Sequence, residues 1–272
     1  MHTVRGANGR MPKKVYYTDR RQNVWLVRQL KKRPPLHEVD FIPVNRKKQL
    51  LELTEEKIIL LWGDGMEHDF SFFIDIPGGR KRNIDGHHDC CFTPDDQLCI
   101  HAANHMAHSA VKHGVKVEIT LPAVVCLDDP TYYELINEQK LLDGVKPIRI
   151  VPISLPFKGE HLTIDLDCVE LFPADAGFMS SDGGGFEIRY LVGLLSKTIE
   201  NGNLRRLDVG GLSGYISTAL EVNGDSLPDT LGDVPRMSVI EFADGRLDKY
   251  SLKIAGFAVK AYYDILKTAI FD

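Results

Sequence analysis

The 272-residue chain has no long hydrophobic run. No segment approaches the roughly 18 consecutive apolar residues that a membrane-spanning helix requires. The first residues contain no apolar stretch of the kind that forms a secretory signal peptide. We therefore expect no contact with a membrane and a cytoplasmic location.

The chain also has no excess of positive charge. Its 33 Lys and Arg residues against 38 Asp and Glu residues give a formal net charge of −5, which provides no basic surface of the kind that binds nucleic acid. The five cysteines are odd in number and lack CxxC spacing, so neither a disulfide framework nor a thiolate zinc site is indicated. We expect reduced thiols and no nucleic-acid partner.

Short apolar or β-branched runs alternate with amphipathic stretches along most of the chain. Strands are expected at 57–62, 82–85, 115–121, 148–153, 162–167 and 237–242, and helices at 100–113, 187–200 and 252–269. This alternation predicts a three-layer α/β fold, in which a mainly parallel central sheet carries helices on both faces. Ligands of such sheets bind at the carboxyl ends of the strands.

The pattern weakens near the N-terminus and in one internal stretch. Residues 1–13 show no periodicity and are predicted to form a flexible tail, so that 14–272 form a single α/β domain. The first 50 residues are compatible with an edge strand, a helix or a peptide-docking surface. Residues 210–236 are rich in Gly, Ser, Asp and Pro, which predicts a loop insertion that could act as a lid. Nothing in the sequence indicates an oligomeric state.

Acidic residues follow two of the expected strands at a spacing of two. Asp85 ends one expected strand and is followed at alternate positions by His87 and Asp89, and Asp165 and Asp167 end another expected strand. Alternate residues that leave a strand point to the same side. Each motif alone also fits a polar turn or a helix cap, but four carboxylates delivered together would repel one another unless cations neutralised them.

The ligand types favour hard or borderline divalent ions. Oxygen ligands with a minority of imidazoles suit manganese, and two such ions would balance four carboxylates. Paired ions about 3.5–4 Å apart lower the pKa of a shared water and generate a hydroxide at neutral pH. The pattern therefore predicts a binuclear hydrolytic site.

At these residues the chain resembles the arginase and agmatinase superfamily of ureohydrolases. The family's Asp-x-His-x-Asp motif, its Asp-x-Asp motif with a following proline, and its upstream histidine match His68, Asp85, His87, Asp89, Asp165, Asp167 and Pro173. The resemblance implies an arginase-like fold that holds two Mn²⁺ ions. One ion would be held by His68, Asp85, Asp89 and Asp165, and the other by Asp85, His87, Asp165 and Asp167.

The resemblance also implies a carboxylate for the substrate guanidinium. Residues 237–242 are similar to the family's Val-Val-Glu-Val strand, which makes Glu241 the candidate. A carboxylate facing a planar guanidinium forms a bidentate, charge-assisted pair. An ordinary strand glutamate is the competing explanation. Glu221 ranks second, and Asp208 ranks third because it is more simply explained as a surface carboxylate.

Two further catalytic roles follow from the family. His101 lies twelve residues after Asp89, close to the family's proton-shuttling histidine, and would protonate the leaving amine. Asp89 would relay the proton released from the attacking water. His101, His105 and His108 also fit partly exposed helix histidines.

The sequence departs from the enzymes that act on free arginine. Cys90 and Cys91 follow Asp89 where those enzymes have an asparagine that helps to hold the substrate's α-carboxylate, and their Ser-x-Asn-x-His-Gly segment is replaced by 97–102. A substrate arginine whose ends are already amides would need neither contact. The pair Glu67-His68 is similar to the Glu-His of a divergent branch that includes the peptide arginases.

The leading hypothesis is a manganese-dependent hydrolase that acts on the C–N bond of a linear amidine. It would convert peptidyl arginine in a precursor peptide to ornithine and release urea, so that an arginine-containing peptide is the expected partner. One alternative is a small-molecule ureohydrolase of the arginase or agmatinase type. Others are a deacetylase-type zinc amidohydrolase, which would need only one metal, and a non-catalytic, metal-stabilised peptide-binding protein.

Overall fold

A computed structural model describes most of the central part of the fold. The described residues are 10–44, 49, 53, 55–62, 80–86, 117–120, 148–170, 185–212 and 247–272. Statements about the structure below refer to these ranges.

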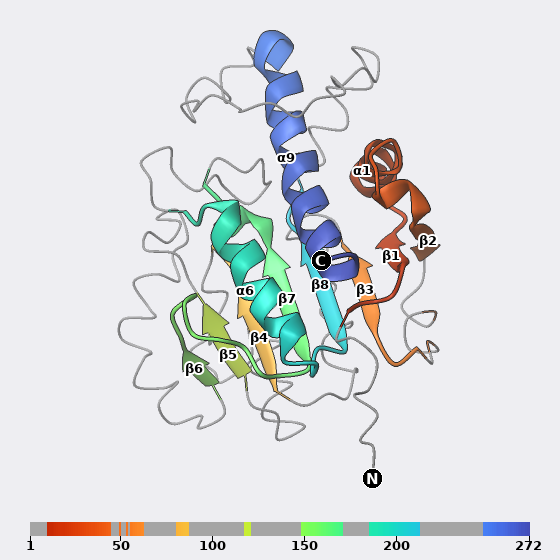
Figure 1. The fold of residues 1–272 in the computed structure, drawn as a ribbon. Helices are drawn as coiled ribbons and strands as arrows, with labels where there is room; N and C mark the ends of the chain where they lie inside the picture. The colour runs from red at the N-terminus through yellow and green to blue at the C-terminus, as the bar shows by residue number, and fades with distance from the viewer. Residues whose placement is uncertain are drawn as a thin grey trace, which may run out of the picture.

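Eight strands form one sheet in the order β2-β1-β3-β8-β7-β4-β5-β6. Their bounds are β1 Lys14–Thr18, β2 Asp40–Val44, β3 Ile58–Leu61, β4 Lys81–Ile84, β5 Val117–Thr120, β6 Ile148–Ile150, β7 His161–Asp165 and β8 Arg206–Gly210. Every neighbouring pair is parallel, and Figure 1 shows the arrows pointing to one common edge. The predicted α/β fold with a mainly parallel sheet is confirmed.

The described residues include three α-helices: α1 Arg21–Lys31, α6 Ile188–Glu200 and α9 Leu247–Ile270. Helices α6 and α9 lie side by side over one face of the sheet, and α1 contacts α9 (Figure 1). The same ranges contain the 3₁₀ turns η1 Leu36–Glu38 and η3 Leu166–Cys168. No helix within the described ranges is long and apolar enough to cross a membrane.

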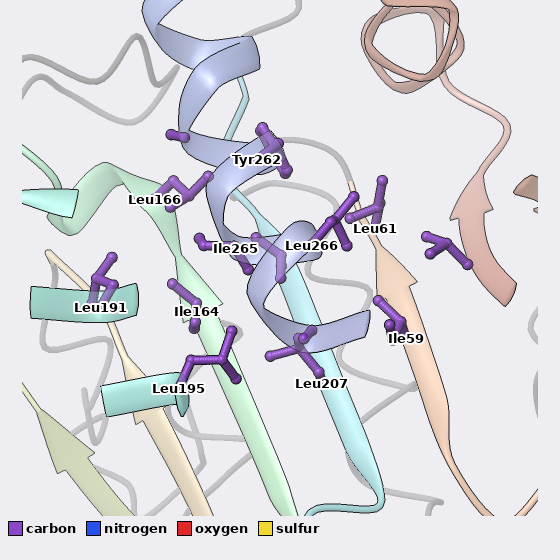
Figure 2. Close-up of a cluster of buried hydrophobic side chains, with 14 of the residues drawn as sticks. Ile59, Leu61, Ile164, Leu166, Leu191, Leu195, Leu207, Tyr262, Ile265 and Leu266 are labelled. Atoms are coloured by element: carbon purple, nitrogen blue, oxygen red, sulfur yellow. The ribbon is translucent and has the colours of Figure 1, made fainter. Parts of the chain in front are cut away.

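The core lies between the sheet and helices α6 and α9 (Figure 2). Helix α6 is amphipathic and turns Leu191 and Leu195 toward the strands. Helix α9 contributes Ile265 and Leu266, which pack toward Leu207 of β8. All five side chains are fully buried, and burial of each stabilises the fold by about 1.5–3 kcal/mol relative to exposure.

The N-terminal residues extend the sheet rather than standing apart from it. Strands β1 and β2, joined through α1, form one end of the strand order, so the strand and helix possibilities left open by the sequence both occur. Met11 lies in the segment predicted to be a tail, yet its side chain is buried and its N–H donates to the carbonyl of Ala269 at 3.0 Å. Residues 1–9 are outside the described ranges.

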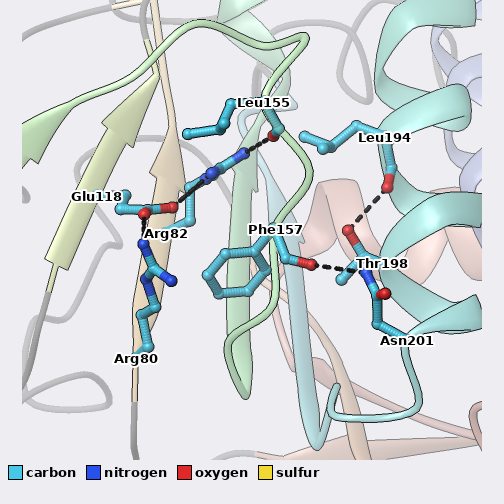
Figure 3. Close-up of polar contacts among 8 residues, drawn as sticks. All are labelled: Arg80, Arg82, Glu118, Leu155, Phe157, Leu194, Thr198 and Asn201. Carbon is cyan, nitrogen blue, oxygen red and sulfur yellow. Dashed lines mark hydrogen bonds and ion pairs between the residues drawn. The ribbon is translucent and has the colours of Figure 1, made fainter.

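A buried ion pair joins β4 to β5 (Figure 3). Arg82 Nε donates to Glu118 Oε2 at 2.9 Å, Arg82 Nη1 donates to the carbonyl of Leu155 at 2.7 Å, and Arg80 also pairs with Glu118. The Arg82 guanidinium lies 5.1 Å from the ring centroid of Phe157. A charge buried this deeply is tolerated because it is paired and hydrogen-bonded. The contacts fix the strand from which Asp85 emerges.

The expected strands at 57–62, 82–85, 115–121, 148–153 and 162–167 are confirmed as β3 to β7, each slightly shorter or shifted. The expected helices at 187–200 and 252–269 are confirmed as α6 and α9, and α9 begins five residues earlier than expected. The expected helix at 100–113, the expected strand at 237–242 and residues 213–236 of the expected loop insertion lie outside the described ranges. Strand β8 was not predicted.

Candidate metal centre

The central strands β4 and β7 deliver two carboxylates to the carboxyl edge of the sheet. Ile84 of β4 pairs with Ile164 of β7, so the residues that follow, Asp85 and Asp165, leave adjacent strands at the same level. The N–H of Asp85 continues the sheet by donating to the carbonyl of Thr120 at 3.2 Å. The position of both carboxylates therefore follows from strand register.

A short turn brings in the third carboxylate. The η3 turn begins directly after Asp165, whose Oδ1 accepts the backbone N–H of Asp167 at 3.0 Å. Gly86 follows shortly after β4, and its N–H donates to Asp167 Oδ1 at 2.8 Å. Asp85 Oδ2 accepts from Nδ2 of Asn83 at 3.0 Å. One oxygen of each carboxylate is thus held by a defined donor.

Asp85, Asp165 and Asp167 form a compact acidic cluster. One carboxylate oxygen from each lies within 4.8 Å of the others, and the three residues are 0%, 3% and 3% exposed. Three anionic groups this close in a buried site repel one another strongly unless protons or cations neutralise them. Each carboxylate has a second oxygen that the three hydrogen bonds above do not use.

The donor set fits a hard divalent cation. Carboxylate oxygens are the ligands that Mn²⁺ and Mg²⁺ prefer, and the hydrogen bonds that orient them are typical of outer-shell support in metal sites. Asn83 Oδ1 is buried and has no hydrogen-bond partner in the part of the chain that the structure describes. An ordered water at the cluster would satisfy that acceptor.

Two buried side chains of other types lie close to the cluster. Burial, with the charges of Asp167, Asp165 and Asp85, raises the pKa of the Cys168 thiol well above its usual value. Burial, with the charge of Asp165, raises the pKa of Tyr262 well above its usual value. Cys168 is therefore a neutral thiol in the core, as expected for a reduced cysteine, and Tyr262 stays a neutral phenol.

Two glycines lie beside the cluster, one as the last residue of the neighbouring strand β8 and one directly after it. Gly210 pairs with Asp165 in the sheet. A Cβ on Gly210 would meet the Trp62 ring at 2.0–2.2 Å, and a Cβ on Gly211 would meet Asp165 Oδ1 at 2.2 Å. Gly210 is therefore closely packed against an indole ring and Gly211 against a carboxylate, and neither position has room for a side chain.

The cluster stands at one end of a buried polar row. On β4, β7 and β8, the residues at alternate positions share one face of the sheet and are polar. They are Lys81, Asn83, His161, Thr163, Arg206 and Asp208. The opposite face of the same strands carries the buried apolar residues Ile84, Leu162, Ile164, Leu207 and Val209.

Asp208 was expected at the surface, and that expectation is wrong. Asp208 is fully buried on β8, where its carboxylate accepts from Arg206 Nε at 2.8 Å and lies 2.6 Å from Nε2 of His161. Burial acts to raise the pKa of Asp208, but the charges of Arg206 and His161 outweigh it and hold the pKa below its usual value. These pairs explain its burial, and Asp208 lies in the middle of β8, opposite Thr163 and two residues before the position that pairs with Asp165.

Three of the predicted site residues, Asp85, Asp165 and Asp167, are brought together by the fold. The others lie outside the described ranges: His68, His87, Asp89, His101 and Glu241. Glu221, the second candidate for the guanidinium, also lies outside them. The sequence interpretation did not include Asn83, Gly86 or Gly211. Asn83 could have been found from its spacing of two before Asp85, which places both on one face of a strand.

No protein-family model matches the chain, and no curated protein matches it in sequence. Solved structures do match it. Arginase from Bacillus subtilis superposes with a TM-score of 0.53 at 11% identity, and arginase from Bacillus cereus with 0.53 at 12%; each match covers 93% of this chain and 97% of the other. Arginase from Entamoeba histolytica in complex with L-ornithine superposes with 0.51 at 8% identity, covering 95% and 99%.

These matches cover almost the whole length of both chains, although the sequences are only 8–12% identical. The chain therefore has the three-layer, arginase-like α/β fold, with a cluster of three buried aspartates at the end of its central strands.

Proposed function

We propose that this protein is a binuclear metal-dependent ureohydrolase that hydrolyses a guanidinium group to urea and an amine. The observation that carries the proposal is the convergence of Asp85, Asp165 and Asp167 within 4.8 Å in a buried site on an arginase-like fold. Neither the acidic cluster nor the fold alone would indicate this reaction.

The metal ligands would be His68, Asp85, His87, Asp89, Asp165 and Asp167, with Mn²⁺ as the proposed ion. Two ions bound there would supply a nucleophile at neutral pH by lowering the pKa of a bound water. Each described carboxylate accepts a hydrogen bond: Asp85 from the Asn83 side chain, Asp167 from the N–H of Gly86, and Asp165 from the N–H of Asp167. The ligands are thereby oriented before an ion binds, which reduces the reorganisation that binding requires.

The reaction consumes one water. A C–O bond forms at the guanidinium carbon, the bond from that carbon to the substituted nitrogen breaks, and both protons of the water end on the departing nitrogen, which leaves as an ammonium group while the urea keeps the oxygen. We propose that Glu241 pairs the guanidinium and fixes its carbon in place. Asp89 relays the proton from the water, and His101 delivers a proton to the amine as it leaves.

The proposed substrate is peptidyl arginine, which becomes ornithine within the peptide. The proposal rests on Cys90 and Cys91, which follow Asp89 where enzymes for free arginine have an asparagine that helps to bind the α-carboxylate. Peptidyl arginine has no free α-carboxylate and needs no such contact. A small-molecule ureohydrolase that acts on arginine or agmatine is the alternative with the same site. A non-catalytic, metal-stabilised peptide-binding protein would keep the metal centre without turnover.

The test is urea release by the Mn²⁺-loaded protein, given free arginine, agmatine and an arginine-containing peptide in parallel. A peptide that loses the elements of cyanamide with release of urea supports the peptide substrate, and urea from the small molecules alone moves the function to the alternative. Asp165→Asn should abolish turnover, whereas Asp40→Asn, a change at an exposed carboxylate on β2, should not. Full metal occupancy without urea from any substrate would refute the ureohydrolase proposal.

A further inference from the structure

Gly211 lies directly after β8, at the carboxyl edge of the sheet. Its neighbour Gly210 pairs with Asp165 of β7, so the backbone of Gly211 runs beside the acidic cluster. Gly211 is itself buried. A residue at this point of the sheet would ordinarily turn a side chain toward one of its neighbours.

The space that a side chain at Gly211 would need is already filled by the cluster. A Cβ placed there would lie 2.2 Å from Asp165 Oδ1, 3.0 Å from Leu166 N and 3.2 Å from Asp167 N. Asp167 N donates to that same Asp165 Oδ1 at 3.0 Å. The hydrogen bond that begins the η3 turn thus lies against the bare Cα of Gly211.

The backbone of Gly211 adds a second requirement. Its φ is +98°, in the region that residues with a side chain rarely adopt. Gly202, at the end of α6, also has a positive φ of +72°, but a Cβ there would have nothing within 4 Å. Gly202 therefore has the conformational requirement without the contact, which makes it a matched control for Gly211.

We infer that Gly211 is a positioning residue for the acidic cluster, because the lack of a side chain there leaves room for the Asp165 carboxylate and the η3 turn. The inference rests on the proposed metal centre and deepens it. Any side chain at residue 211 would push Asp165 Oδ1 away from the N–H of Asp167. Both carboxylates would then leave the arrangement in which they can share ions with Asp85.

The first test compares Mn²⁺ binding, by isothermal titration calorimetry, to the wild type and to the variants Gly211→Ala and Gly202→Ala. Gly211→Ala should weaken binding by about tenfold or more, as expected when the support of a ligand is lost. Gly202→Ala should leave the affinity close to that of the wild type, although both variants place a methyl group at positive φ. Wild-type affinity in folded Gly211→Ala would overturn the inference.

The second test needs no metal and covers the case in which Gly211→Ala folds poorly. Melting temperatures are measured in EDTA for Gly211→Ala alone, Asp165→Ala alone and the double variant. Removal of the Asp165 side chain should relieve the contact, so Gly211→Ala should lower the melting temperature much less in the Asp165→Ala background. An equal loss in both backgrounds, or failure of both Gly211 variants to fold, would overturn the inference.

The two tests separate this inference from the proposed function. If the wild type binds no Mn²⁺, the proposed function fails, and the melting temperatures in EDTA still decide whether Gly211 makes room for Asp165. If the wild type binds Mn²⁺ and Gly211→Ala binds it equally well, the metal centre stands and the role of Gly211 fails.

Discussion

Nε2 of His161 lies 2.6 Å from Oδ2 of Asp208, and both side chains are almost fully buried between parallel strands β7 and β8. Asp208 keeps its pKa below the usual value, so it is a carboxylate that accepts the Nε2–H of a neutral imidazole. Burial lowers the pKa of His161 to about 4, against the opposing charge of Asp208. The pair is a hydrogen bond between a neutral ring and an anion at neutral pH.

This pair predicts a loss of stability in mild acid. The pKa of His161 is about 4 in the folded protein, below its usual value of about 6.5, so the unfolded chain takes up a proton first as the pH falls. The stabilising contribution is complete above about pH 6.5 and is lost between there and about pH 4, with a slope of at most about 1.4 kcal/mol per pH unit.

Urea denaturation at a series of pH values measures that slope. His161→Gln removes the titrating ring, so the free energy of unfolding should change less with pH between about pH 6.5 and pH 4. Below about pH 4 the variant should still lose stability, because carboxylates are protonated there. An unchanged slope in His161→Gln would contradict the assignment.

Asp208→Ala should be strongly destabilising. It leaves the buried Arg206 guanidinium without the carboxylate that accepts its Nε–H, and breaking a buried pair from one side costs about 3–5 kcal/mol. The control is Glu38→Ala, which removes an exposed partner of Lys13 and should cost little, because ion pairs at the surface add little to stability. Denaturant midpoints of the two variants test the contrast, and similar losses would contradict it.

Asn83→Ala should weaken metal binding without unfolding the protein. Asn83 Nδ2 donates to Asp85 Oδ2 at 3.0 Å, and loss of an outer-shell partner typically lowers metal affinity about 10- to 100-fold. Asn203→Ala, at an exposed asparagine after α6, is the matched control. Titration with Mn²⁺ measures the affinity of both variants. Equal Mn²⁺ affinities of Asn83→Ala and Asn203→Ala would contradict a role for Asn83 in metal binding.

Metal should stabilise the wild type because an ion neutralises Asp85, Asp165 and Asp167. At a free Mn²⁺ concentration of 100 times Kd, the free energy of unfolding should rise by about 2.7 kcal/mol. Asp167→Asn keeps an oxygen for the N–H of Gly86 but removes one charge. In EDTA this variant should be at least as stable as the wild type, since repulsion is reduced, and Mn²⁺ should stabilise it far less. Melting curves with and without Mn²⁺ measure this, and a full metal response in the variant would contradict the site.

Gly193→Ala should stabilise the protein away from the site. Gly193 lies on the exposed side of α6, and a Cβ there would have nothing within 4 Å. Alanine is more favourable than glycine in a helix interior by about 0.5–1 kcal/mol. Thermal denaturation should show the gain with Mn²⁺ affinity unchanged. A loss of stability would indicate a contact that the fold does not show.

The sequence alone determined the elements whose patterns are local. Strands β3, β5, β6 and β7 contain short apolar or β-branched runs, and α6 and α9 show apolar residues at helical spacing. Helix α6 also has a clear stop at Asn201 and Gly202. The spacing of Asp165 and Asp167 after β7, and the position of Asp85 after β4, were sufficient to predict that these carboxylates converge. Parallel strands bring their carboxyl ends to one edge, so strand order and direction carry that information.

Only the tertiary structure decided where charged strand residues lie. Arg206 and Asp208 alternate with Leu207 and Val209, a pattern that equally fits a surface segment. Strand β8 is nevertheless fully buried, because His161 of β7 supplies a side-chain partner for Asp208. Likewise, no local pattern indicates that Gly211 makes room for Asp165, since the two residues are 46 positions apart. Contacts between strands join residues that are far apart in the sequence, and their energy decides which charged side chains are buried and where a side chain fits.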